Sequence, residues 1–171
     1  MRDVALFLNG VYEDVLKGIL AVQAHLPEHI MYLQPYSGER IVRLAENTPT
    51  VDDPVRLFVS VTDDLTTVRY VGEIVGWDDK RKLKGAKRRI LNRLIYLLQP
   101  TEDGVYRRGR AGGPECVNLL YIRRLHKLSM PFSVDQLINA NTGEPLSTGR
   151  TQSGGWVYIV NPDETWLKGH L

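Results

Sequence analysis

The sequence lacks the features that mark several large classes of protein. Its 171 residues include one cysteine, Cys116, which excludes an internal disulfide framework and leaves too few thiols for a zinc cluster. No apolar run approaches the roughly 20 residues of a membrane-spanning helix. The apolar stretch near the first residue is too short for the core of a secretory signal, and no small-residue cleavage site follows it. We therefore expect a cytoplasmic protein in a reducing compartment.

Catalytic and cofactor-binding patterns are also scarce. The four histidines lack metal-ligand spacing, and Pro27 breaks the helix that would align His25 with His29. Cys116 precedes an expected strand, where a lone cysteine is more often a small buried hydrophobe than a nucleophile. Adjacent acid pairs are typical of turns and caps, and the glycines form neither a Walker loop nor a dinucleotide fingerprint. The sequence predicts no metal, no cofactor and no catalytic residue, although it does not exclude an enzyme.

Charge is nearly balanced, at +2, but unevenly distributed. Eight basic residues and no acid stand between Lys80 and Arg93. Like charges at helical spacing repel by a few tenths of a kcal/mol per pair, so such a stretch indicates an anionic partner, most commonly phosphate. We expect nucleic acid rather than a membrane, because the apolar face of this helix looks necessary for the core. The residues predicted to hold phosphates are Lys80, Arg81, Lys84, Lys87, Arg88, Arg107, Arg108 and Arg110.

Short β-branched and aromatic runs between turn residues predict a strand-rich fold. The clearest is a hairpin over 55–62 and 66–77, in which Gly72 and Gly76 indicate a bulge, a bend or a close approach. Apolar periodicity predicts two longer helices. They span 11–26 and 80–98, the second burying Leu83, Ala86, Ile90, Leu94 and Leu97 or Leu98. The other predictions are strands at 4–8, 29–33, 40–44, 117–128 and 156–160 and a short helix at 133–138.

These elements predict an α+β fold in a single domain over 1–171. Strands joined by short turns favour an antiparallel or mixed sheet over a doubly wound parallel one. Closing such a sheet into a small β-barrel, with the helices on its flanks, would remove exposed strand edges.

Tryptophans beside glycines suggest where a ligand could stack. Trp77 follows Gly76 at the end of a strand, just before the basic helix, and Trp156 follows Gly155 at the start of another. Such an arrangement is commonly plain packing, but it also builds pockets in which a base stacks on an indole. The basic sector beside Trp77 favours the pocket there, and Arg150 would add a donor at the rim near Trp156.

The hairpin from Val55 to Trp77, with its Phe-Val-Ser and Gly-Glu-Ile-Val-Gly-Trp segments, resembles the PUA-like superfamily, nearest its EVE and YTH-like members. Residues 128–137 and 148–150 are similar to the late part of EVE domains, where a proline, a short helix and Gly-Arg follow one another. The resemblance implies a small pseudo-barrel that binds RNA or DNA, often with a flipped modified base in an aromatic pocket. Carried onto matching positions, it implies a pocket of Trp77, Tyr70 and Arg150.

This sequence departs from the EVE pattern in two places. The Tyr-Trp opening of EVE domains is absent, and the basic helix and the arginine-rich segment after it are additions. We expect a non-enzymatic nucleic-acid-binding module with a base pocket of Trp77, Tyr70, Trp156 and Arg150. Two alternatives stay open. One is an ASCH-like nuclease or toxin-type enzyme using Lys80, Arg150 or Tyr158, and the other is a domain whose basic helix binds an acidic protein.

Overall fold

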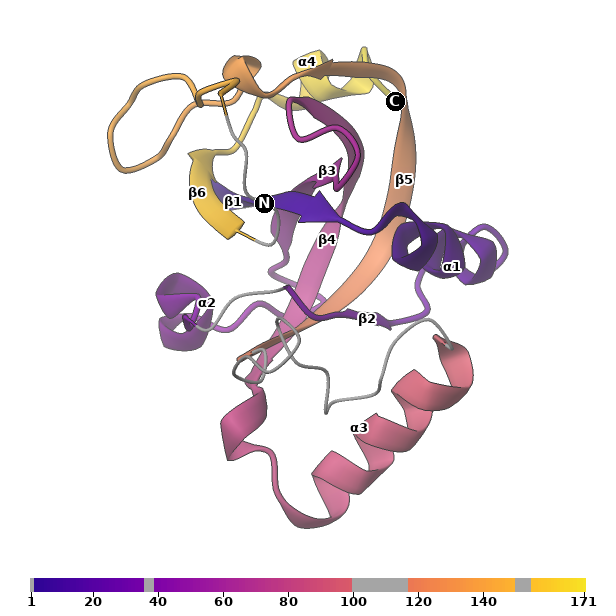
Figure 1. Ribbon diagram of the computed structural model, residues 1–171. Coiled ribbons are helices and arrows are strands. Elements are labelled where there is room, and N and C mark those ends of the chain that lie inside the picture. Colours follow the sequence, from indigo (N-terminus) through magenta and orange to yellow (C-terminus); the bar gives the residue numbers. More distant parts are fainter. Residues whose placement is uncertain (1, 36–38, 100–116, 150–154) are drawn as a thin grey trace.

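Six strands form one mixed sheet in the computed structural model of the protein (Figure 1), which describes residues 2–35, 39–99, 117–149 and 155–171. The strands are β1 (Val4–Val11), β2 (Met31–Leu33), β3 (Val55–Val61), β4 (Thr67–Asp79), β5 (Asn118–Ser133) and β6 (Gly155–Val160). The helices are α1 (Glu13–Gln23), α2 (Val42–Glu46), α3 (Gly85–Leu98) and α4 (Glu164–Lys168), with 3-10 turns η1 (Lys80–Lys82) and η3 (Val134–Gln136). The predicted α+β class is confirmed.

The sheet order is β2-β5-β4-β3-β1-β6, so strands from both ends of the chain lie side by side. Only β1 and β3 are parallel among these pairs, and the mixed character expected from the sequence is confirmed. The predicted hairpin forms β3 and β4. The order begins at β2 and ends at β6, and no hydrogen-bonded pairing joins these two strands in the described part of the chain.

Hydrophobic side chains fill both faces of the sheet. Along β1, Leu6 and Leu8 enter a large core that α1 covers, whereas Ala5 and Phe7 enter a second core closed by α4. A strand buried on both faces reads as a continuous apolar run rather than an alternating one, which explains the unbroken Val4-to-Leu8 segment.

Irregular pairing between β4 and β5 explains the glycines of the hairpin. The register shifts between Val71 and Glu73 and again between Ile74 and Gly76. A Cβ atom added at Gly76 would lie 2.8 Å from Cδ2 of Tyr121, closer than side chains approach one another. Gly76 therefore permits a close approach, one of the three alternatives that the sequence offered, and the approaching group is the ring of Tyr121.

Two of the expected elements are wrong. Residues 40–44 form no strand; Val42–Glu46 is helix α2, because Ile41 and Leu44, three apart, are both buried on one side of a single turn. The helix expected over 80–98 is divided into η1 and α3, and α3 starts at Gly85, whose φ of 58° suits glycine.

The expected buried face of α3 is also wrong. Leu91 and Ile95 are buried, together with Leu83 before the helix, whereas Ile90, Leu94 and Leu97 are exposed. The helix carries two apolar stripes one residue apart, and it packs through the 91–95 stripe against Tyr32 of β2 and Leu119 of β5.

Gln99 closes the outer edge of the sheet just after α3. Its Oε1 accepts a hydrogen bond of 2.7 Å from the backbone N–H of Tyr32, and its Nε2 donates one of 2.6 Å to the carbonyl of the same residue. The amide thus occupies the position of a neighbouring strand on the edge strand β2 and anchors the end of α3 to the sheet.

We expect Gln99→Ala to lower the free energy of unfolding by roughly 1–3 kcal/mol, because it leaves a buried N–H and a buried carbonyl without partners. Urea denaturation followed by circular dichroism measures the change. Gln136→Ala, at an exposed position in η3, is the control and should alter stability little. A Gln99→Ala variant as stable as the control would contradict this role.

Candidate functional site

A cleft of about 390 Å³ opens where β4 ends and the chain turns into η1 and α3. β4 supplies Trp77 and two aspartates, and the opposite wall comes from residues in and before α2. Lysines from η1 and the start of α3 stand along the rim. The cleft is lined by Arg40, Ala45, Trp77, Asp78, Asp79, Lys82, Leu83, Lys84 and Lys87. The structure therefore brings Trp77 and the start of the basic stretch together, as the sequence suggested.

Asn118 fixes the orientation of the Trp77 indole. The Nε1 of Trp77 donates to the Oδ1 of Asn118 over 2.9 Å, and the same oxygen accepts a 3.0 Å bond from the backbone N–H of Ile41. The Nδ2 of Asn118 donates to the carbonyl of Glu39 over 2.7 Å. Asn118 is fully buried, so one amide joins both walls of the cleft.

The two aspartates of the cleft are already paired within the protein. Arg81 donates from Nε and Nη2 to the two carboxylate oxygens of Asp79, over 3.0 and 2.8 Å. These hydrogen bonds lower the pKa of Asp79 below its ordinary value, despite its burial. Asp78 accepts hydrogen bonds from the hydroxyl of Tyr121 and from Nζ of Lys87, the latter over 3.1 Å. Burial, and then this bond to Asp78, raises the pKa of Tyr121 above its usual range.

Three cations of the cleft have no such partner among the residues that the structure describes. Arg40, Lys82 and Lys84 are exposed, and no carboxylate of the described residues forms a salt bridge with them. Since both aspartates are neutralised by Arg81 and Lys87, these three side chains give the cleft a net positive charge. Such a cleft suits an anion.

The other predicted phosphate ligands do not all lie on the surface of the cleft. Arg88 is half-buried and donates to the backbone carbonyl of Lys80 over 2.9 Å, a structural role. Lys80 itself is fully buried, contrary to its expected place on the surface, because the chain turns inward at η1, where its N–H donates to the carbonyl of Val117. Arg107, Arg108 and Arg110 lie outside the described residues.

The predicted base pocket is not assembled as one group. Tyr70 is completely buried in the large core, and its hydroxyl donates to Glu13 of α1 over 2.7 Å. Burial, followed by this bond, raises the pKa of Tyr70 far above its usual range. Trp156 is half-buried on β6, away from the lining of the Trp77 cleft, with its ring centroid 5.1 Å from that of Tyr158. Arg150 lies outside the described residues.

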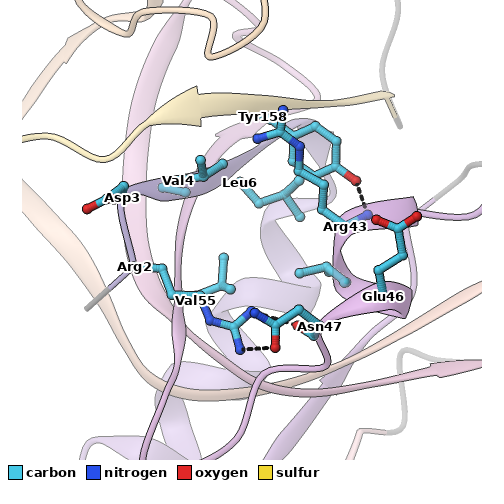
Figure 2. A pocket seen from close by; sticks show the side chains of 11 residues that line it. Arg2, Asp3, Val4, Leu6, Arg43, Glu46, Asn47, Val55 and Tyr158 are labelled. Carbon is cyan, nitrogen blue, oxygen red and sulfur yellow. Dashed lines mark hydrogen bonds between the residues drawn. The ribbon is translucent and has the colours of Figure 1, made fainter.

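A second, larger cleft of about 640 Å³ lies between β1 and the other side of α2 (Figure 2). The guanidinium of Arg43 stacks over the ring of Tyr158 at 4.7 Å, and the Tyr158 hydroxyl accepts a 2.7 Å bond from the backbone N–H of Arg43. Arg2 is held at the opposite side by Asp53 and by the carbonyl of Asn47. Sequence reasoning missed this cleft, because its residues come from distant segments that share no motif.

The clefts offer binding groups rather than a recognisable reaction centre. Within the described ranges, no group of three histidine, cysteine or acidic side chains is placed to hold a metal ion. No helix in that part of the chain is long and apolar enough to span a membrane.

Comparisons of the chain with protein-family models, with curated proteins and with solved structures gave no significant match.

The ion pair of Asp79 predicts a dependence of stability on pH. A carboxylate whose pKa is lowered in the folded state stabilises the fold above its unfolded value, ordinarily 3.8, and this contribution is lost as the pH falls through the folded value. We expect Asp79→Asn to be less stable than the wild type at pH 7, with the difference shrinking below about pH 4.

Urea denaturation at a series of pH values measures the difference. Asp135→Asn removes an exposed carboxylate from η3 and is the matched control. A difference between Asp79→Asn and the wild type that stays constant from pH 7 to pH 3 would show that the charge of Asp79 does not stabilise the fold.

Proposed function

We propose that the protein is a nucleic-acid-binding module whose binding surface consists of the Trp77 cleft and the adjoining basic residues of η1 and α3. The observation that carries the proposal is the presence of Arg40, Lys82 and Lys84 around a partly buried indole, with no ion pair to a carboxylate of the described residues. Phosphates bind such cations. Any nucleobase can stack on an aromatic ring, largely regardless of which base it is. One ligand that has both groups is a nucleic acid.

The relation to PUA-like and EVE domains, with a closed barrel and a flipped or modified base, belongs to this proposal. Support for it comes from the mixed sheet and from the position of Trp77 in the lining of a cleft. A cytoplasmic location is likewise proposed, from the single cysteine. Of the three predicted pocket residues that the structure describes, Trp77 would hold the base, because Tyr70 is buried in the core and Trp156 packs beside Tyr158 of the other cleft.

The two alternatives receive less support. A nuclease would need Lys80, Arg150 or Tyr158 beside the bound backbone, but Lys80 is fully buried and Tyr158 lines the cleft on the other side of α2. An acidic protein could form ion pairs with Arg40, Lys82 and Lys84 equally well. The presence of Trp77 in the lining of the cleft favours a ligand with flat rings.

Salt dependence tests the contribution of phosphate contacts. We expect affinity for a labelled oligonucleotide to fall steeply as salt rises, and the Lys82→Ala/Lys84→Ala double variant to reduce the slope of log K against log [salt] by about one per lost contact. Fluorescence anisotropy at several salt concentrations measures this slope.

The control removes the same charge elsewhere, with Lys17→Ala on α1 and Lys168→Ala on α4. It should leave the slope almost unchanged. Equal losses in the two double variants would mean that only net charge matters, and binding that is insensitive to salt would favour a protein partner.

Substitution at Trp77 tests stacking. We expect Trp77→Phe to retain most of the affinity, because the ring face remains, and Trp77→Leu to lose about 5- to 100-fold, the usual value of one base–aromatic stack. Leucine keeps apolar volume against the core, and in both variants Asn118 keeps its bonds to Ile41 and Glu39. Anisotropy measures affinity and thermal melting checks the fold. Equal affinity of the leucine and phenylalanine variants would exclude stacking.

A further inference from the structure

Helix α3 exposes a stripe of large apolar side chains that belongs to none of the hydrophobic cores of the described residues. Ile90, Leu94 and Leu97 are 59%, 38% and 65% exposed. Their spacing of four and three residues places them on one face. The neighbouring face, with Leu91 and Ile95, already attaches the helix to the body. Phosphate binding alone gives no reason for an exposed apolar stripe.

Cations flank this stripe on both sides. At about 100° per residue, Lys87 stands along one border of the stripe and Arg89 and Arg93 along the other. The helix contains no acidic residue. Lys87 pairs with Asp78, but 60% of its side chain is exposed, and surface pairs of this kind contribute little. The exposed face is therefore an apolar centre between two positive borders.

The helix is attached to the body at several points and leaves this face exposed. It lies at the end of the molecule opposite α4 (Figure 1), and it is attached through Leu91, Ile95 and the amide of Gln99. Arg88 ties its first turn to the carbonyl of Lys80. Its 14 residues make a rod of about 21 Å.

The major groove of B-form DNA matches this face in shape and charge. The groove is about 12 Å wide and admits a helix of 10–12 Å diameter, with a row of phosphates along each border. Thymine presents a methyl group at the floor, where it contacts apolar side chains. The major groove of A-form RNA is too deep and narrow for side chains to read.

We propose that the outer face of α3 enters the major groove of double-stranded DNA. Ile90 and Leu94 would contact thymine methyl groups, while Lys87 on one border and Arg89 and Arg93 on the other would contact the two phosphate backbones. This inference rests on the proposed function and adds the kind of nucleic acid to it. An anionic membrane surface, which also suits a basic helix with an apolar stripe, is the competing partner.

Binding to four ligands tests the inference. They are a thymine-rich DNA duplex, the corresponding RNA duplex, the single DNA strand, and vesicles of phosphatidylcholine and phosphatidylserine. The full chain should bind the DNA duplex at least about tenfold more tightly than the RNA duplex, because only B-form DNA admits the helix. Preference for RNA or for the single strand would overturn this inference and leave the proposed function standing. Binding to vesicles alone, or to no ligand, would overturn both.

A duplex with deoxyuridine in place of thymidine separates groove reading from charge, because it lacks only the methyl groups. Wild-type affinity should fall about fivefold or more on this duplex, within the usual range for a base contact. Ile90→Ala/Leu94→Ala should bind both duplexes equally, whereas Leu26→Ala, at an equally exposed residue outside α3, should still distinguish them. Equal wild-type affinity for the two duplexes would overturn the contact with thymine. These exposed positions allow substitution without loss of folding, which melting curves would verify.

Discussion

The buried amide of Asn118 is the constraint on which the candidate site depends. It stands at the first residue of β5 and bonds at once to the indole of Trp77, the N–H of Ile41 and the carbonyl of Glu39. A buried amide with satisfied partners holds a single geometry, because each alternative leaves a polar group without a hydrogen bond. The ring of Trp77 and the segment that leads into α2 are thus set against each other, and the width of the cleft follows from one side chain.

The net charge of the cleft depends on the ion pairs that its two aspartates form. Asp78 and Asp79 end β4 and would oppose an anion if they faced the cleft unpaired. Instead, Arg81 takes both oxygens of Asp79, and Lys87 with Tyr121 takes Asp78. Three of the eight basic residues between Lys80 and Arg93 thus have structural roles, namely Lys80, Arg81 and Arg88, while Lys87 pairs with Asp78 only at the surface. The excess available to a ligand is smaller than composition suggests, and it lies at defined positions on the rim and on α3.

Sequence analysis predicted the elements that local residue patterns determine. It failed for the features that tertiary packing determines. The hairpin of β3 and β4 could be predicted, because its β-branched residues and glycines determine strand and turn structure within a short stretch of sequence. The buried face of α3 was not, because residues 90–94–97 and 91–95–98 are both apolar stripes and only packing against Tyr32 and Leu119 selects one. The resemblance to EVE domains implied Tyr70 as a pocket residue, yet its side chain is completely buried in the large core. The bonds of Asn118 span 41 to 79 residues, beyond any local signal.

Hydrogen bonds hold the segment that connects the Trp77 cleft to α3. Asp79 caps η1 through the N–H of Arg81, the N–H of Lys80 bonds to Val117 beside the start of β5, and Arg88 returns from α3 to the Lys80 carbonyl. Burial of Lys80 follows from this turn rather than from a ligand-binding role. A polymer that contacts both Trp77 and α3 therefore meets groups already in position, and binding needs little ordering of the protein. Such preorganisation would reduce the entropic cost of the proposed association, so a few cations and one indole on this surface would contribute more affinity than the same residues on a flexible segment.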